Sequence, residues 1–230
     1  MMRISIINGS QKTGESNSGI ILNALRKRIK NDCEIKNYKL SMRLFTEEIY
    51  NEIIAGDVIV LAFPLYGHSI PSNVLKMLIE LERILNKKQT KEIIVYTIIN
   101  NGLYEGKQTH IAFEMIKNWC NHCGIKFGGG IGQGAGEMLG AIKGIPLNIS
   151  PFSNLGRALK VLANKLSLKE PFDIMYLSPY FPRFLWKIIA HSTWKKRASK
   201  NGLRKKDIIS TPLKSDKNKL EINEQQEIDV

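Results

Sequence analysis

The chain is poor in cysteine and contains no long apolar segment. Three cysteines among 230 residues cannot pair fully, so a disulfide scaffold is excluded and a reducing cytoplasm is expected. No window approaches the roughly 18 apolar residues of a membrane-spanning helix. The start, MMRISIINGS, has one basic residue and a short apolar run, unlike a signal peptide. We therefore expect a cytoplasmic protein that does not cross a membrane.

Acidic residues are also in the minority. The chain has 21 Asp and Glu against 34 Lys and Arg, giving a formal net charge of +13 and a pI near 9.6. With 43% hydrophobic and 24% charged residues, the composition is globular and excludes wholesale disorder. The length suits one domain of about 150–200 residues with an extension. No nucleic-acid motif accompanies the basic surplus, and we expect no nucleic-acid partner.

The period of the apolar residues switches repeatedly between strand and helix. Continuous β-branched runs predict buried strands at 3–8, 57–63 and 92–99, with weaker candidates at 34–40 and 126–131. Helical spacing predicts intervening helices around 21–29, 74–85, 111–120 and 155–166. This alternation predicts an α/β domain over residues 1–170, with a doubly wound, five-stranded parallel sheet. Its ligand should lie beyond the carboxyl ends of the strands.

The loop after the first strand is rich in glycine, serine and asparagine, and it opens a helix. Such a loop offers backbone N–H groups, hydroxyls and the positive end of the helix dipole, so it predicts a phosphate site. The candidate ligands in this loop are Ser10, Lys12, Ser16, Asn17 and Ser18. The alternative is simple helix capping by Ser16 or Ser18.

Two common nucleotide motifs are excluded. The run from Gly9 to Ser16 matches a nucleoside-triphosphatase P-loop except that Glu15 replaces its lysine, and a carboxylate there would repel a triphosphate. The run 130–135 imitates a dinucleotide fingerprint, but no acidic residue follows about 20 positions later. We interpret it as a flexible or closely packed backbone segment. A monophosphate fits the first loop best.

Three segments follow the first, third and fourth predicted strands in order, at 9–18, 64–71 and 100–106. Together they resemble the flavodoxin-like NAD(P)H-dependent FMN reductase family over roughly residues 1–170. The first is the Gly9-Ser10…Ser16-Asn17-Ser18 loop, which is similar to the family's FMN phosphate loop. The second follows the third strand, with a helix starting at Ser72, and the third follows the fourth strand. The resemblance implies that the last two loops face the flavin through Pro64, Leu65, Tyr66, Gly67, His68, Asn100, Asn101, Gly102 and Tyr104.

The resemblance implies a flavodoxin-like fold and an FMN-dependent oxidoreductase. Such an enzyme takes hydride from NADH or NADPH and reduces a small acceptor, such as a quinone or free flavin, with no catalytic side chain. We expect a positive φ or close ring approach at Gly102, because the chain turns there. The Cys120-Asn121-His122-Cys123 segment lacks a second cysteine pair, so we expect no metal site.

Two other functions stay open. One is a flavodoxin-type electron carrier, which the positive charge disfavours because such carriers resemble acidic proteins. The other is a basic membrane- or nucleic-acid-associated protein with a vestigial flavin fold. The sequence also departs from the family pattern, with Gln11-Lys12 where many relatives have a proline and a basic residue, and with unusually dense glycine over 128–136.

Beyond the domain, residues 171–206 predict an aromatic linker and a basic amphipathic helix, and 207–230 a polar, flexible tail. Residues 181–206 include nine basic residues and no acidic one, and apolar residues recur at 181, 184, 185, 188 and 189. We expect this stripe to pack on the domain or on a second subunit of a homo-oligomer. The remaining basic surface would contact anionic surfaces weakly. The alternative is a helix that lies on anionic lipid.

Overall fold

The computed structural model describes residues 1–30, 32–40, 44–87, 92–141, 146–204 and 207. The chain divides into two compact units, Met1–Tyr180 and Phe181–Val230. Except for Asp207, the tail expected over 207–230 lies outside the described residues.

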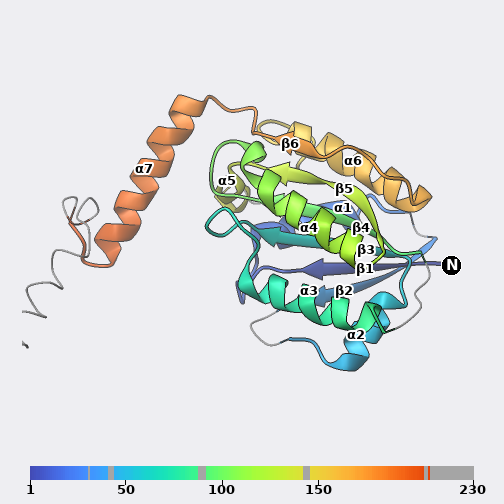
Figure 1. Cartoon of the computed structure of the whole chain (residues 1–230). Coiled ribbons are helices and arrows are strands. Elements are labelled where there is room, and N and C mark those ends of the chain that lie inside the picture. Colours follow the sequence, from blue (N-terminus) through green and yellow to red (C-terminus); the bar gives the residue numbers. More distant parts are fainter. Residues whose placement is uncertain (31, 41–43, 88–91, 142–145, 205–206, 208–230) are drawn as a thin grey trace, which may run out of the picture. The chain divides into compact units, whose positions relative to one another are not determined.

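The first unit is built on a parallel sheet of six strands in the order β2-β1-β3-β4-β5-β6 (Figure 1). The strands are β1 (Met2–Asn8), β2 (Cys33–Lys39), β3 (Val58–Pro64), β4 (Ile94–Asn100), β5 (Lys126–Gln133) and β6 (Met175–Leu177). The first five strands have the flavodoxin-like order, in which the order of strand addition reverses between β1 and β3.

The prediction of five strands was wrong, because β6 lies in the segment expected to be a linker. It has only three residues, and it pairs in parallel with Ile131–Gln133 at the end of β5. A three-residue strand that is only partly buried has neither the length nor the apolar run that identified the others.

Helices cover both faces of the sheet (Figure 1). They are α1 (Asn17–Arg26), α2 (Glu47–Ile54), α3 (Ser72–Leu85), α4 (His110–His122), α5 (Gly136–Ala141) and α6 (Ser153–Leu168), with a 3₁₀ turn η1 (Gly106–Thr109). Successive strand residues point to opposite faces. Accordingly, Leu61 packs in a core with α2, α3 and α4, whereas its neighbour Val60 packs in a second core with α1 and α6.

The glycine-rich strand β5 is closely packed. A Cβ on Gly132 would collide with the Thr109 hydroxyl, and one on Gly130 would collide with the Phe113 ring and the Thr97 carbonyl. Only glycine lets η1 and α4 approach the sheet so closely. The interpretation of this run as closely packed backbone is confirmed.

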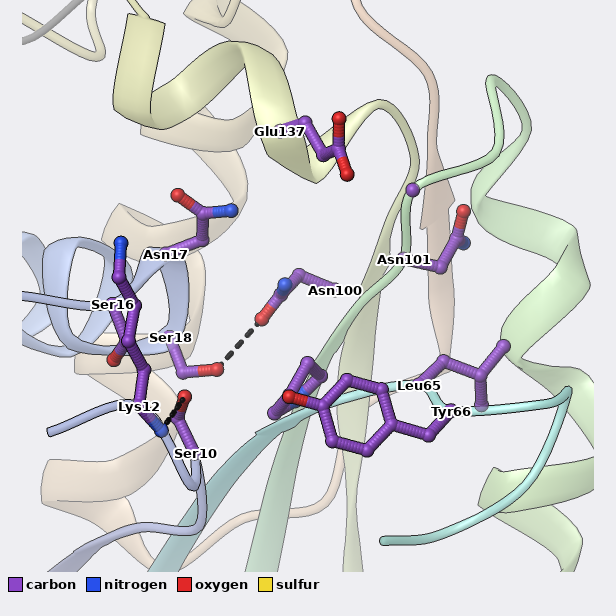
Figure 2. A pocket seen from close by; sticks show the side chains of 12 residues that line it. Ser10, Lys12, Ser16, Asn17, Ser18, Leu65, Tyr66, Asn100, Asn101 and Glu137 are labelled. Carbon is purple, nitrogen blue, oxygen red and sulfur yellow. Dashed lines mark hydrogen bonds between the residues drawn. The ribbon is translucent and has the colours of Figure 1, made fainter. Parts of the chain in front are cut away.

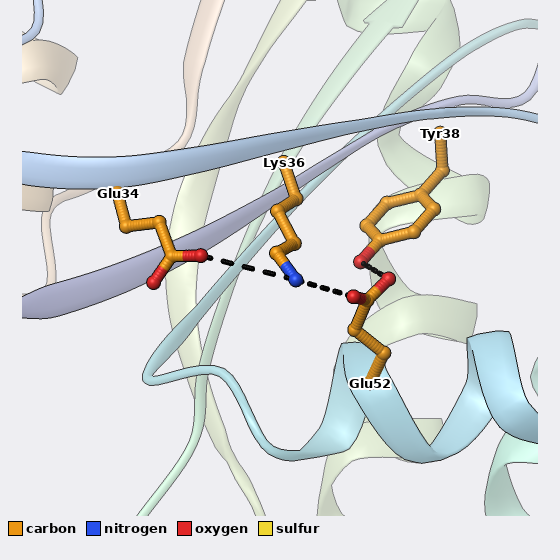
Figure 3. A network of polar contacts seen from close by, with 4 residues as sticks. All are labelled: Glu34, Lys36, Tyr38 and Glu52. Atoms are coloured by element: carbon orange, nitrogen blue, oxygen red, sulfur yellow. Dashed lines mark hydrogen bonds and ion pairs between the residues drawn. The ribbon is translucent and has the colours of Figure 1, made fainter.

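A polar network joins the edge strand β2 to α2 (Figure 3). Lys36 donates a hydrogen bond to Glu52 and lies 3.8 Å from Glu34, and the Tyr38 hydroxyl donates to Glu52 Oε2 at 2.6 Å. The bond from Lys36 lowers the pKa of Glu52, and burial beside Glu52 raises the pKa of Tyr38. Charged side chains along β2 also discourage another strand from pairing with this edge.

Candidate functional site

Three loops meet at the point where the strand order reverses. Because β1, β3 and β4 are neighbours in the sheet, the segments after their carboxyl ends surround one pocket of about 340 Å³ (Figure 2). This volume lies within the roughly 300–1,000 Å³ usual for small-molecule sites. The pocket is lined by Ser10, Lys12, Ser16, Asn17, Ser18, Pro64, Leu65, Tyr66, Asn100, Asn101, Gly102 and Glu137.

Ser16 is the N-cap of α1, as the capping alternative supposed. Its Oγ accepts hydrogen bonds from the Gly19 N–H at 3.1 Å and from Asn8 Nδ2 at 3.3 Å. A serine hydroxyl has two acceptor lone pairs and one proton. Both lone pairs are therefore occupied, and the proton remains available for a ligand acceptor. Capping and ligand binding are compatible at this residue.

The start of α1 suits an anion. Its first turn contains no acidic residue, and the backbone N–H groups of Asn17 and Ser18 have no hydrogen-bond partner in the described part of the chain. Unpaired N–H groups at a helix N-terminus attract negative charge. Ser10, which is buried, adds a further hydroxyl at the same end of the pocket.

Ser18 has a different function from Ser16. It is only 1% exposed, and its hydroxyl donates to Asn100 Oδ1 at 2.7 Å (Figure 2). Because its proton is engaged, Ser18 cannot donate to a phosphate at the same time. The bond instead ties the loop after β1 to the loop after β4, and it orients the Asn100 amide.

Residues that the sequence did not indicate hold the first loop in place. From the end of β2, Lys39 Nζ donates to the carbonyl oxygens of Thr13 at 2.7 Å and Gly14 at 3.3 Å. From the start of α3, buried Asn73 donates through Nδ2 to the Gly9 carbonyl at 3.2 Å. These partners lie at least 25 residues away in sequence, so no local motif reveals them.

The loop after β3 contains a tight turn over Tyr66-Gly67-His68-Ser69. Gly67 and His68 have φ of 54° and 63°, and Tyr66 and Ser69 exchange backbone hydrogen bonds of 3.1 and 3.0 Å. Two successive positive φ values are typical of a type I′ turn. The turn presents Tyr66 to the pocket with 49% of its surface exposed, whereas Gly67 and His68 do not line the pocket.

The backbone amides of this loop are less available than the sequence suggested. The N–H of Leu65 donates to the Asn100 carbonyl at 2.8 Å, and the N–H of Tyr66 is the one bonded to Ser69. Side chains, rather than these two amides, therefore face the pocket.

The loop after β4 is anchored by buried asparagines. Asn101 donates through its backbone N–H to Gln133 O at 2.9 Å and through Nδ2 to Glu105 O at 3.1 Å. Gly102 lines the pocket, but its φ is not positive, so the first of its two expected features is absent, and the second, close approach of a ring, stays a prediction. Among the three pocket loops, it is the preceding one that contains left-handed residues. Tyr104 does not line the pocket, because its hydroxyl reaches the Pro179 carbonyl at 3.3 Å.

The carboxylate of Glu137 is the lining residue that sequence reasoning missed. It comes from the first turn of α5 (Figure 2), after β5, which is not one of the strands at the reversal point. A methyl group placed at Gly102 would lie 3.9 Å from Glu137 Oε1, which shows how closely these two loops approach. A carboxylate here can accept an N–H from a ligand, and it disfavours extra negative charge nearby.

The Cys120-to-Cys123 segment ends α4 and lies outside this pocket. Both cysteines are buried, and burial raises the pKa of each thiol to about 12. Such thiols are protonated at neutral pH and are poor nucleophiles or metal ligands. Within the described ranges, no three His, Cys, Asp or Glu side chains gather as metal ligands.

No protein-family model matches the chain, and no curated protein matches it in sequence. Solved structures share its fold. An NADPH-quinone reductase from P. pentosaceus is 12% identical, with a TM-score of 0.53 over 72% of this chain and 97% of that chain. The Trp repressor binding protein from Bacillus subtilis is 15% identical, with a TM-score of 0.51 over 69% and 96%. An apo NADH:FMN oxidoreductase is 12% identical, with a TM-score of 0.51 over 74% and 90%. These similarities establish a flavodoxin-like α/β fold.

Proposed function

We propose that this protein is an FMN-dependent oxidoreductase that takes hydride from NADH or NADPH and reduces a small acceptor, such as a quinone or free flavin. The observation that carries the proposal is the division of one pocket into two chemical halves. One half offers hydroxyl and N–H donors at a helix N-terminus, and the other offers an aromatic side chain, amides and a glycine.

The first half fits a phosphate monoester. Ser16 contributes a hydroxyl whose lone pairs are already occupied, and α1 contributes the unpaired N–H groups of Asn17 and Ser18. Lys12 lies at the rim and adds positive charge without entering the buried part of the pocket. Hydrogen bonds to an ionised acceptor are shorter and stronger than neutral ones, so this set favours a dianion.

The second half fits a flat, partly apolar ring. Pro64, Leu65 and Tyr66 form one side of the pocket, and Asn100 with Gly102 forms the neighbouring side. The hydrogen bond from Ser18 fixes the Asn100 side chain, so its Nδ2 group keeps a defined direction. When bound, FMN supplies the redox chemistry, by accepting a hydride and passing its electrons on. The protein needs only to hold the phosphate, orient the ring and leave one ring face accessible.

Two structural neighbours are consistent with this reaction class, since they are named as an NADPH-quinone reductase and an NADH:FMN oxidoreductase. Glycine at 102 leaves room beside Glu137 for a ring edge.

We also propose that the protein forms a homo-oligomer and that it is located in the cytoplasm. Light scattering of the purified protein measures the oligomeric state.

The experiment is to load the purified protein with FMN, remove unbound flavin, and follow oxidation of NADH and of NADPH with a quinone or free FMN as acceptor. The proposal predicts stoichiometric FMN and turnover with at least one nicotinamide donor. A protein that retains FMN but transfers no hydride from either donor would instead be an electron carrier. A protein that retains no flavin would refute the proposal.

A further inference from the structure

The second unit contains one described helix, α7 (Arg183–Lys200), and none of its residues is buried. The helix begins two residues after Phe181, so the apolar stripe that was expected to start at Phe181 starts within the helix at Phe184. Within the helix the exposed aliphatic side chains and Phe184 lie in the first two turns, and Trp194 lies farther along. Phe184 is 64% exposed, Ile188 is 61% exposed, and Leu185 and Ile189 are also exposed.

The same face changes character along the helix. Lys195 and Lys196 lie seven residues after Ile188 and Ile189, and a seven-residue step returns to nearly the same side of an α-helix. The face is therefore apolar over its first half and basic over its second half. The helix contains no acidic residue, and its basic residues are Arg183, Lys187, Lys195, Lys196, Arg197 and Lys200.

We propose that α7 binds the surface of an anionic lipid bilayer. Exposed aliphatic and aromatic side chains can enter the interface between headgroups and acyl chains, and lysines beside them can reach the lipid phosphates. The helix would lie on the bilayer, because no helix in the described ranges is long and apolar enough to cross one.

The charge of α7 favours an anionic bilayer over a second copy of the chain as its binding partner. Pairing α7 with itself would bring two helices together, each with six basic residues and no acidic one, in a chain whose net charge is already +13. An anionic bilayer provides the opposite charge and an apolar layer together. This proposal does not depend on FMN binding or on hydride transfer.

The test is flotation of the full-length protein with phosphatidylcholine vesicles, with and without about one-third phosphatidylglycerol, at low and physiological salt. We expect flotation with the anionic vesicles, and at least tenfold weaker partitioning onto neutral ones, since each basic residue near an anionic surface contributes about fivefold.

Two pairs of variants separate the apolar and the electrostatic contributions. Phe184→Gln with Ile188→Gln, which leaves the charge unchanged, should abolish flotation, whereas Ile79→Gln, a change at an exposed isoleucine of α3, should not. Lys195→Glu with Lys196→Glu should weaken binding at least tenfold. The same charge change at Lys117 and Lys160, both exposed in the first unit, should leave most binding intact.

Three results would overturn the proposal. They are no flotation with either vesicle, equal flotation with both, or equal loss in the control variants. If the Phe184 and Ile188 changes instead convert an oligomer to a monomer without any lipid binding, the apolar face is an interface between copies. Circular dichroism of each variant checks that the α/β unit remains folded.

Discussion

Ser16→Asp separates phosphate binding from every other property of the pocket. Aspartate is as good an N-cap as serine, and its charge is favourable at a helix N-terminus, so α1 should keep its start. The same carboxylate would replace the hydroxyl whose proton neither of the two bonds to Ser16 uses, and it would repel a phosphate dianion. The change therefore preserves the fold while reversing the charge preference of the site.

The magnitude follows from the bonds at Ser16. Loss of one charge-assisted hydrogen bond costs about 1.5–3 kcal/mol, or roughly 10- to 150-fold in affinity. Repulsion by the new carboxylate adds to this, so FMN affinity should fall by at least about 100-fold. Riboflavin has no phosphate, and its affinity should change by less than about twofold. Ser16→Ala should also weaken FMN about 10- to 150-fold, but with about 1 kcal/mol of lost stability because the cap is removed.

Titration calorimetry and flavin fluorescence at pH 7.5, with FMN and riboflavin in parallel, measure both affinities. This pH keeps the phosphate dianionic, since its second pKa is about 6. If Ser16→Asp weakens both flavins equally, the residue shapes the pocket rather than holding a phosphate. If neither affinity changes, the loop after β1 is not part of the flavin site.

Other predictions concern the remaining contacts. Ser18→Ala should lower the affinity for FMN and for riboflavin by a similar factor, about 5- to 50-fold, because it removes the bond that orients the Asn100 amide and no bond to the phosphate. A loss of affinity for FMN alone would contradict this. Glu137→Gln should raise the two-electron midpoint potential of bound flavin by about 30 mV, because it removes a negative charge that disfavours the reduced ring. Dye-coupled titration measures this potential. An unchanged or lower potential would show that the carboxylate does not interact electrostatically with the reduced ring. Glu52 has a lowered pKa in the folded protein, so its ionised form stabilises the fold above its ordinary value of 4.5, and that contribution is lost progressively as the pH falls from 4.5 through the lowered pKa. Glu52→Gln should therefore lower the melting temperature at pH 7, and this loss should become smaller as the pH is lowered below 4.5. An equal loss at every pH would exclude the ion pair with Lys36 as the cause.

Features that depend on continuous local patterns were predicted well. The buried strand β3 was recognised because it is β-branched and apolar throughout, and both of its faces are indeed covered by helices. The start of α3 at Ser72 was also confirmed. The parallel sheet followed from these elements, because alternating strands and helices favour a parallel arrangement.

Features that depend on distant partners were not predictable. Ser18 and Asn100 are 82 residues apart, and only the adjacency of β1, β3 and β4 brings them together. Glu137 enters the pocket from beyond β5, where no motif marks it. In the loops after β3 and β4, the positive φ values are at Gly67 and His68 rather than at Gly102, because a Gly-His pair closes the turn that the bonds between Tyr66 and Ser69 define.

Anaerobic mixing of the FMN-loaded protein with NADH, and separately with NADPH, tests the central claim most directly. The account predicts that at least one donor bleaches the yellow absorbance of the bound flavin in a single phase, and that adding a quinone restores it. A bound flavin that neither donor bleaches, although dithionite does, would contradict the assignment as a nicotinamide-dependent oxidoreductase.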